Sequence, residues 1–191
     1  MRQILKILLL SSFFFNLAAG LLGPIYAVFV ERIGGNLIMT GGAAAAFSIV
    51  SGILIYIFAK WEDKIKHQEN IIILGRLLSF IGITGYIFVQ SVVHLFAVEI
   101  LLGIATAFST PAYDSLYSKN LQKGKFASQW GSWESMYSIT VGIAAIIGGI
   151  VAQQYGFKVL FIAMSIITGL SLIAALLLRK DMREMFKKEG R

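Results

Sequence analysis

The chain has 191 residues, of which 57% are hydrophobic and only 14% are charged, and its mean hydropathy is +0.77. Because soluble domains carry about a quarter charged residues, this composition indicates a protein of the lipid bilayer and argues against a soluble enzyme. The absence of cysteine excludes disulfides and cysteine-ligated metal sites. The two histidines, His67 and His94, are predicted on opposite membrane faces, so we expect neither a metal site nor a cofactor.

Six apolar stretches are long enough to cross a membrane, for which a helix needs about 20 residues over about 30 Å of hydrocarbon. The predicted spans are Ile7–Val30, Leu37–Ala59, Ile71–Val89, Val92–Tyr117, Ser128–Ala152 and Phe157–Leu178. Lipid offers no water to satisfy open backbone groups, so segments of this length are predicted to be helices. The expected fold class is an all-α membrane protein, with residues 1–191 as a single six-helix domain and a basic tail over 179–191.

The first apolar stretch could be mistaken for a secretory signal. Arg2 and Lys6 precede it, and the small residues 18–20 are typical of a cleavage site. The stretch continues to Val30, however, which is too long for a signal core, so we predict a membrane helix. Pro24 is expected to bend this helix.

The basic residues set the predicted orientation. Fourteen of the seventeen lysines and arginines lie at the amino end, in the loops over 60–70 and 118–127, or after Leu178. The opposite side carries only Arg32 and Lys158, while Arg76 lies just inside the third span. The positive-inside rule therefore predicts a multi-pass protein of the plasma membrane with both termini in the cytoplasm. This topology accounts for the net charge of +7 without nucleic-acid binding, and the tail is basic enough to lie near anionic lipid.

Two pairs of segments echo each other at an offset of about 90 residues. Residues 47–53 (FSIVSGI) match residues 137–143 (YSITVGI), and residues 24–26 (PIY) match residues 111–113 (PAY). The shared register predicts a three-helix unit used twice, over about 1–90 and 91–178, with the second copy inverted in the membrane. Inverted repeats of three helices are typical of transporters.

The helix count, loop lengths and repeat make the whole chain resemble the amino-terminal half of a major facilitator superfamily transporter. The family's loop between helices 2 and 3 reads G-x-x-x-D-R-x-G-R-R/K. Here residues 59–68 read AKWEDKIKHQ, which retains the acid Asp63 and the base Lys64 but neither glycine. The resemblance implies that this acid meets a helix end of the other half and helps to latch the outward-facing state.

Two further motifs of the family are altered in this chain. Where the fourth helix often has R-x-x-x-G, this sequence has an acid, Glu99, four residues before Gly103. The antiporter motif of the fifth helix, G-x8-G-x3-G-P-x2-G-G, is matched only at Gly131, Gly148 and Gly149. Family members have twelve helices in two halves, so the resemblance implies that two copies of this six-helix chain form a homodimer. The basic tail is typical of a natural end.

One face of the fourth predicted helix is polar. Glu99, Gly103, Thr106, Thr110 and Asp114 are spaced four, three, four and four residues apart, which places them on a single helix face. A charge at the bilayer centre costs from about 3 kcal/mol upward, so this face is expected to point to protein or water. The resemblance places the first and fourth helices around the central cavity, so Glu99, Thr106 and Thr110 are candidates for the substrate and proton pathway.

Glu99 and a further pathway candidate, Asn16, each have a structural alternative. Glu99 is predicted about 10 Å from the outer end of its helix, where a carboxylate can carry a proton. The alternatives are a buried pair with His94 or an acid that stays hydrated near the surface. In the first helix, Asn16 is a candidate for substrate contact, although a membrane asparagine more often forms a hydrogen bond with a neighbouring helix.

Glu134 lies among Trp130, Trp133 and Tyr137 near the inner end of the fifth predicted helix. An acid beside aromatic rings can hold a cation by charge and cation–π attraction, which adds Glu134 and Tyr137 to the candidate pathway. The alternative is an aromatic belt at the membrane interface, with an acid that reaches water.

A gating network is expected near the cytoplasmic side. Asp114 is predicted within reach of Arg76 or of the region of His67, and the resemblance implies that an acid here joins the loop between helices 2 and 3. The candidate network comprises Asp63, Lys64, His67, Arg76 and Asp114. A static pair at a helix end is the alternative for Asp114.

Small residues form two smooth helix faces. By resemblance, the second helix of one half packs against the fifth helix of the other, and small residues allow such close approach in lipid. The candidate dimer interface therefore comprises Gly41, Gly42, Gly142, Gly148 and Gly149. Packing within one half is the alternative for these glycines.

The leading hypothesis is a secondary active transporter that works by alternating access as a proton-linked homodimer. The sequence has no nucleotide-binding loop, so direct ATP drive within this chain is excluded. Acids in the membrane, with Arg76 as the one obvious membrane base, favour a small neutral or cationic organic solute. The alternative is a non-transporting half that completes or regulates another membrane partner. A third alternative is a membrane enzyme or lipid-handling protein, which would need a catalytic cluster at the interface, whereas His67 and His94 are predicted on opposite faces. A channel is a further alternative, although the sequence has no selectivity-filter signature.

Overall fold

The computed structural model describes residues 3–189 and the side chains up to Arg179, and the described part consists of helices and their connections. The order is α1 (Gln3–Leu22), the 3-10 turn η1 (Gly23–Ile25), α2 (Tyr26–Arg32), α3 (Leu37–Glu62), α4 (Gln68–Gly85), the 3-10 turn η2 (Tyr86–Phe88), α5 (Val92–Lys119) and α6 (Phe126–Glu189). The all-α prediction is confirmed. Two predictions fall on residues or side chains that the structure does not describe, namely the lipid contact of the basic tail and the contribution of Arg2 to the positive charge at the amino end.

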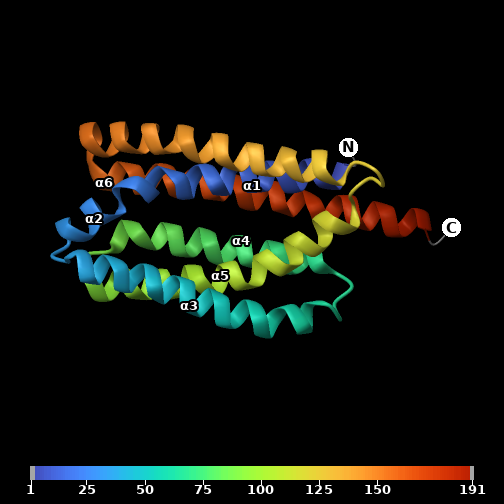
Figure 1. The fold of residues 1–191 in the computed structure, drawn as a ribbon, viewed down its shortest axis with the longest axis horizontal. Helices are drawn as coiled ribbons and strands as arrows, with labels where there is room; N and C mark the ends of the chain where they lie inside the picture. Colours follow the sequence, from blue (N-terminus) through green and yellow to red (C-terminus); the bar gives the residue numbers. More distant parts are fainter. Residues whose placement is uncertain (1–2, 190–191) are drawn as a thin grey trace.

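Five helical segments of the described residues are long and apolar enough to span a membrane. The fifth, Phe126–Arg179, has 54 residues, which would extend about 81 Å as a straight helix against about 30 Å of hydrocarbon. Gly156 interrupts it with non-helical angles of φ 82° and ψ 167°. Figure 1 shows the two arms of α6, residues 126–155 (yellow to orange) and 157–189 (orange to red), running side by side. The predicted fifth and sixth helices are thus parts of one element, since only Gly156 leaves the helical conformation.

Local sequence explains where several elements begin and bend. The side chain of Asn36 accepts a hydrogen bond from the Met39 amide and caps α3, and Ser91 caps α5 through the His94 amide. The predicted bend at Pro24 is confirmed, because Pro24 lies in the 3-10 turn between α1 and α2. Pro111, its counterpart in the sequence repeat, lies inside the uninterrupted α5, so the two prolines do not share a local structure.

The helices pack in a bundle in which α1 lies along α6, α4 contacts α5 and α6, and α3 contacts α5. Figure 1 shows the start of α1 and the end of α6 at the same end of this bundle. The closest approach is between α1 and the amino-terminal arm of α6. There a Cβ on Gly20 would lie 2.9 Å from that of Ala144, and a Cβ on Gly148 would lie 1.9 Å from the carbonyl oxygen of Leu21.

Two apolar clusters occupy the two ends of the bundle. One includes Leu21, Phe29, Tyr86 and Phe161, and the other includes Leu8, Ile72, Tyr113 and Leu178. Buried polar residues lie between the clusters along the chain, in a layer that contains Ser11, Ser12 and Asn16 of α1, Arg76 and Ser79 of α4, Ser109 of α5, and Thr168 and Ser171 of α6. Two cavities border this polar layer.

Candidate functional site

Two adjoining cavities lie among α1, α4, α5 and the amino-terminal arm of α6. The larger has a volume of about 520 Å³ and is also bordered by α3, and the smaller has a volume of about 220 Å³. Four residues line both cavities, namely Phe15, Asn16, Thr106 and Tyr137. The two cavities therefore form a continuous lined region of the polar layer.

Glu99 is the acid of the larger cavity. Its side chain is 6% exposed, and one carboxylate oxygen accepts hydrogen bonds from the hydroxyls of Tyr26, at 2.7 Å, and Tyr86, at 2.6 Å. The alternative pairing with His94 is wrong, because His94 is exposed and instead accepts a hydrogen bond from the Gln90 amide. Two hydroxyl donors on one oxygen hold the carboxylate in place and leave the other oxygen for a further partner.

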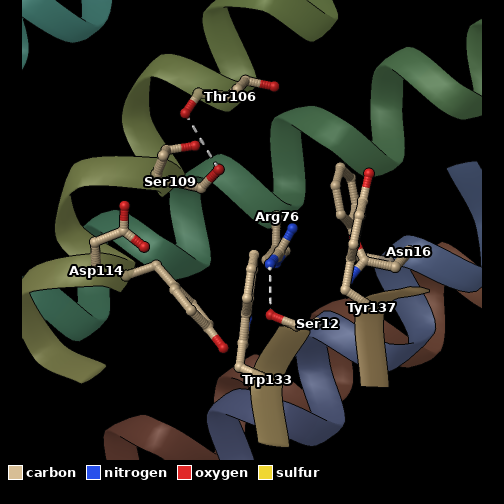
Figure 2. Close-up of a pocket in the computed structure, with 11 residues that line it drawn as sticks. Ser12, Asn16, Arg76, Thr106, Ser109, Asp114, Trp133 and Tyr137 are labelled. Carbon is tan, nitrogen blue, oxygen red and sulfur yellow. Dashed lines mark hydrogen bonds between the residues drawn. The ribbon is translucent and has the colours of Figure 1, made fainter. Parts of the chain in front are cut away.

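Arg76 is the base of the smaller cavity, and Figure 2 shows it among Ser12, Asn16 and Trp133. It is 5% exposed, its Nη2 donates to the Ser12 hydroxyl at 3.4 Å, and its guanidinium lies 4.3 Å from the centroid of the Phe15 ring. The predicted salt bridge between Asp114 and Arg76 does not form in this structure. Both residues line the smaller cavity, but α1 holds the guanidinium through Ser12 and Phe15.

The remaining pathway candidates divide into two groups. Asn16, Thr106 and Tyr137 line both cavities, and Thr110 lines the smaller one. Glu134 lines neither cavity, and its side chain is exposed on α6. The structure therefore brings together all the pathway candidates except this acid.

The predicted gating residues outside the cavities lie at the connection between α3 and α4. Asp63 caps α3, and both Asp63 and Lys64 are exposed. His67 pairs with Glu69, whose carboxylate oxygen lies 3.0 Å from its Nδ1. Within the described residues, no ion pair joins Asp63 or Lys64 to Asp114.

The glycines predicted at a dimer interface differ in their surroundings. A Cβ added at Gly41, Gly142 or Gly149 would meet no atom within 4 Å, so these positions are open. At Gly42 it would lie 3.2 Å from the Phe96 ring of the same chain. The prediction for Gly148 is wrong, because its backbone contacts α1 of the same chain and leaves no room for a partner there.

Sequence reasoning missed the groups that hold the two central charges. Tyr26 and Tyr86 are hydroxyl-bearing residues inside apolar spans, a signal that can be noticed, but their convergence on Glu99 depends on packing across distant segments. Ser12, the hydrogen-bond partner of Arg76, is 64 residues away from it in sequence.

Comparisons with known proteins are consistent with this architecture. Residues 8–190 match the profile of the Major Facilitator Superfamily. The chain is 26% identical over 152 residues to an uncharacterized MFS-type transporter of Methanocaldococcus jannaschii, covering 80% of this chain and 39% of that protein. It is 28% identical over 162 residues to the multidrug resistance protein MdtG of Dickeya zeae, covering 81% of this chain and 39% of that protein. It is 24% identical over 159 residues to the uncharacterized MFS-type transporter YitZ of Bacillus subtilis, covering 81% of this chain and 93% of that protein. The chain thus spans about two fifths of the length of the first two relatives.

Proposed function

Because the chain belongs to the Major Facilitator Superfamily, a family of membrane transporters and not of enzymes, we propose that it is a secondary active transporter that works by alternating access. The chain is a multi-pass integral membrane protein. The proposed activity is proton-linked movement of a small organic solute by a homodimer. The observation that carries the proposal is Glu99, buried in the larger cavity and held by two tyrosine hydroxyls.

The proposed topology has six passes with both termini in the cytoplasm. The turn at Gly156 supports two passes for α6, since its arms run side by side (Figure 1). An even number of passes agrees with two chain ends at one end of the bundle. The excess of lysine and arginine at the chain ends and in the α3–α4 and α5–α6 connections supports the cytoplasmic assignment. The two inverted three-helix repeats belong to the same proposal.

Glu99 is proposed as the proton carrier. A carboxylate in the membrane is costly unless it is paired or neutralised, and here its described hydrogen-bond partners are two neutral hydroxyls. Taking up a proton would remove the charge while leaving one oxygen free to accept the tyrosine hydrogen bonds. The same carboxylate, when charged, would attract a cationic solute, which supports a solute that is neutral or cationic.

The homodimer is proposed because one side of the larger cavity is bordered by exposed residues. Ala44 and Ser48 of α3 line this cavity and are exposed, and Tyr137 of α6 is 41% exposed. The open glycines Gly41 and Gly142 belong to the same two helices. A second copy packed against α3 and the amino-terminal arm of α6 would complete the wall of the cavity.

Transport can be tested in proteoliposomes that contain an internal pH dye. We expect solute-dependent proton flux on addition of a small neutral or cationic organic solute, with a zwitterionic amino acid and a cationic dye such as ethidium as the two probes, and loss of this flux in Glu99→Gln. Glu31→Gln is the matched control, because Glu31 is an exposed acid at the end of α2. Equal flux in Glu99→Gln and in the parent protein would refute the role of Glu99 as proton carrier.

The dimer can be tested by cysteine crosslinking, because the chain has no native cysteine. Gly41→Cys combined with Gly142→Cys is expected to give an intermolecular product in native membranes. Ile166→Cys is the control, since its side chain is 63% exposed on the other arm of α6. Monomer alone, with pairs at Ser48 and Gly149 also silent, would contradict the homodimer.

A second candidate is a non-transporting half that completes or regulates a different membrane protein. The observation that favours it is the side of the larger cavity bordered by the exposed residues Ala44, Ser48 and Tyr137, which a different protein could also cover. The same crosslinking experiment separates the two candidates, because only the homodimer is expected to give a product of twice the mass of this chain.

A further inference from the structure

Arg76 is a buried base that the proposed proton and cation chemistry does not use. It is 5% exposed in the polar layer, yet no acid of the described residues lies within ion-pairing distance. Its contacts are a long hydrogen bond to the neutral Ser12 and the face of the Phe15 ring. A guanidinium has five donors, so these contacts leave most of its hydrogen-bonding capacity unused.

The wall around Arg76 is rich in donors. The Asn16 side chain is 9% exposed, and its Nδ2 makes no hydrogen bond to a described residue, nor does Nε of Arg76. The indole of Trp133 and the hydroxyl-bearing ring of Tyr113 line the same cavity. Figure 2 shows Asn16 and Asp114 on opposite sides of Arg76 in the view, and Asp114, the one acid of this lining, has an exposed side chain.

We infer that the smaller cavity is the anion-recognising end of the solute site and takes a carboxylate group, with Arg76 and Asn16 as its donors. Guanidinium and amide N–H groups match the two oxygens of a carboxylate, and a cavity of about 220 Å³ admits a carboxylate with a few carbon atoms. This inference rests on the proposed transport function and narrows its solute class. A solute with a carboxylate in this cavity would extend past Asn16 and Thr106 toward Glu99. A zwitterion, which is neutral overall, satisfies both cavities.

Binding is measured directly, without transport, on the purified protein in lipid nanodiscs. Trp61→Phe and Trp130→Phe leave Trp133 as the only tryptophan, so its emission reports on the smaller cavity. The probe is sodium propionate, compared with the isosteric propionamide plus sodium chloride. We expect a saturable change in emission with propionate only. An equal response to the amide or to sodium chloride would overturn the carboxylate assignment.

Variants then test the named residues. Arg76→Gln is expected to weaken propionate binding at least tenfold, and Arg76→Lys, which keeps the charge without the planar fork, to weaken it less. Arg32→Gln is the matched control, because Arg32 is an exposed arginine over the Phe157 ring, and binding should stay within twofold. If Arg76→Gln does not fold, Arg76→Lys and Asn16→Ala carry the test, and unchanged binding in both would overturn the inference.

Asp114→Asn separates the inference from a static pairing of Asp114 with Arg76. Removing a competing negative charge is expected to tighten propionate binding about twofold or more. Loss of binding in Asp114→Asn would overturn the inference. Propionate binding without any solute-linked proton flux would support the anion site and reject the proposed transporter. Solute-linked proton flux without propionate binding would support the transporter and reject the anion site.

Discussion

The packing of α1 on the amino-terminal arm of α6 can be tested by Gly148→Ala. A Cβ at this position would lie 1.9 Å from the Leu21 carbonyl oxygen and 2.6 Å from its carbonyl carbon. An ordinary contact begins at 3.4 Å, so the two helices would have to separate by about 1.5 Å. The contacted atoms are backbone, so no change of rotamer can relieve the overlap, and Leu21→Ala would not rescue the variant.

The magnitude follows from two opposing terms. Overpacking of this kind costs up to about 3 kcal/mol, while replacing glycine by alanine in a helix gains about 1 kcal/mol. The net loss is therefore about 2 kcal/mol for Gly148→Ala. At Gly149 a Cβ meets nothing within 4 Å, so Gly149→Ala should keep the gain of about 1 kcal/mol.

The assay is thermal unfolding of the purified protein, followed by the loss of its monodisperse peak in size-exclusion chromatography. For a chain of this size, 1 kcal/mol corresponds to about 2–4 °C, so Gly148→Ala should unfold about 4–8 °C below the parent. Gly149→Ala should unfold at or above the parent temperature. If Gly148→Ala is as stable as Gly149→Ala, the described α1–α6 packing is wrong.

Two further predictions concern the turn and the central hydrogen bonds of α6. Gly156→Ala should lower the free energy of unfolding by about 1–3 kcal/mol, measured by thermal unfolding, because φ 82° with ψ 167° is a conformation that only glycine adopts readily. Gly131→Ala is the control and should be neutral or stabilising, because a Cβ at Gly131 meets no atom within 4 Å. Ser171→Ala should lower the free energy of unfolding by about 0.6–1.7 kcal/mol, because the Ser171 hydroxyl donates to the Ser11 carbonyl at 2.7 Å in the polar layer. An equal loss of stability in Ser138→Ala, at an exposed position, would contradict this explanation.

The sequence predicted the features that depend on neighbouring residues. The predicted starts at Leu37 and Val92 are explained by capping residues directly before them, and Pro24 bends the first span as expected. The break between residues 152 and 157 was also expected, although the structure contains it as a single non-helical glycine.

The features that depend on packing between distant segments could not be predicted. Gly148 and Gly149 are adjacent, and successive residues of a helix point about 100° apart, so one faces α1 and the other open space. The periodicity of the sequence does not predict which of the two glycines faces α1. The partners of Glu99 were missed for the same reason, because the Tyr26 hydroxyl comes from a segment 73 residues away.

The polar layer between the two apolar clusters affects how the helices of this bundle can move relative to one another. Its internal ties, such as Ser11 with Ser171 and Thr84 with Ser165, join helices of the same bundle. Aromatic and aliphatic side chains close both ends around them. These hydrogen bonds tie α1 and α4 to the carboxy-terminal arm of α6, so the described helices are expected to move as one body.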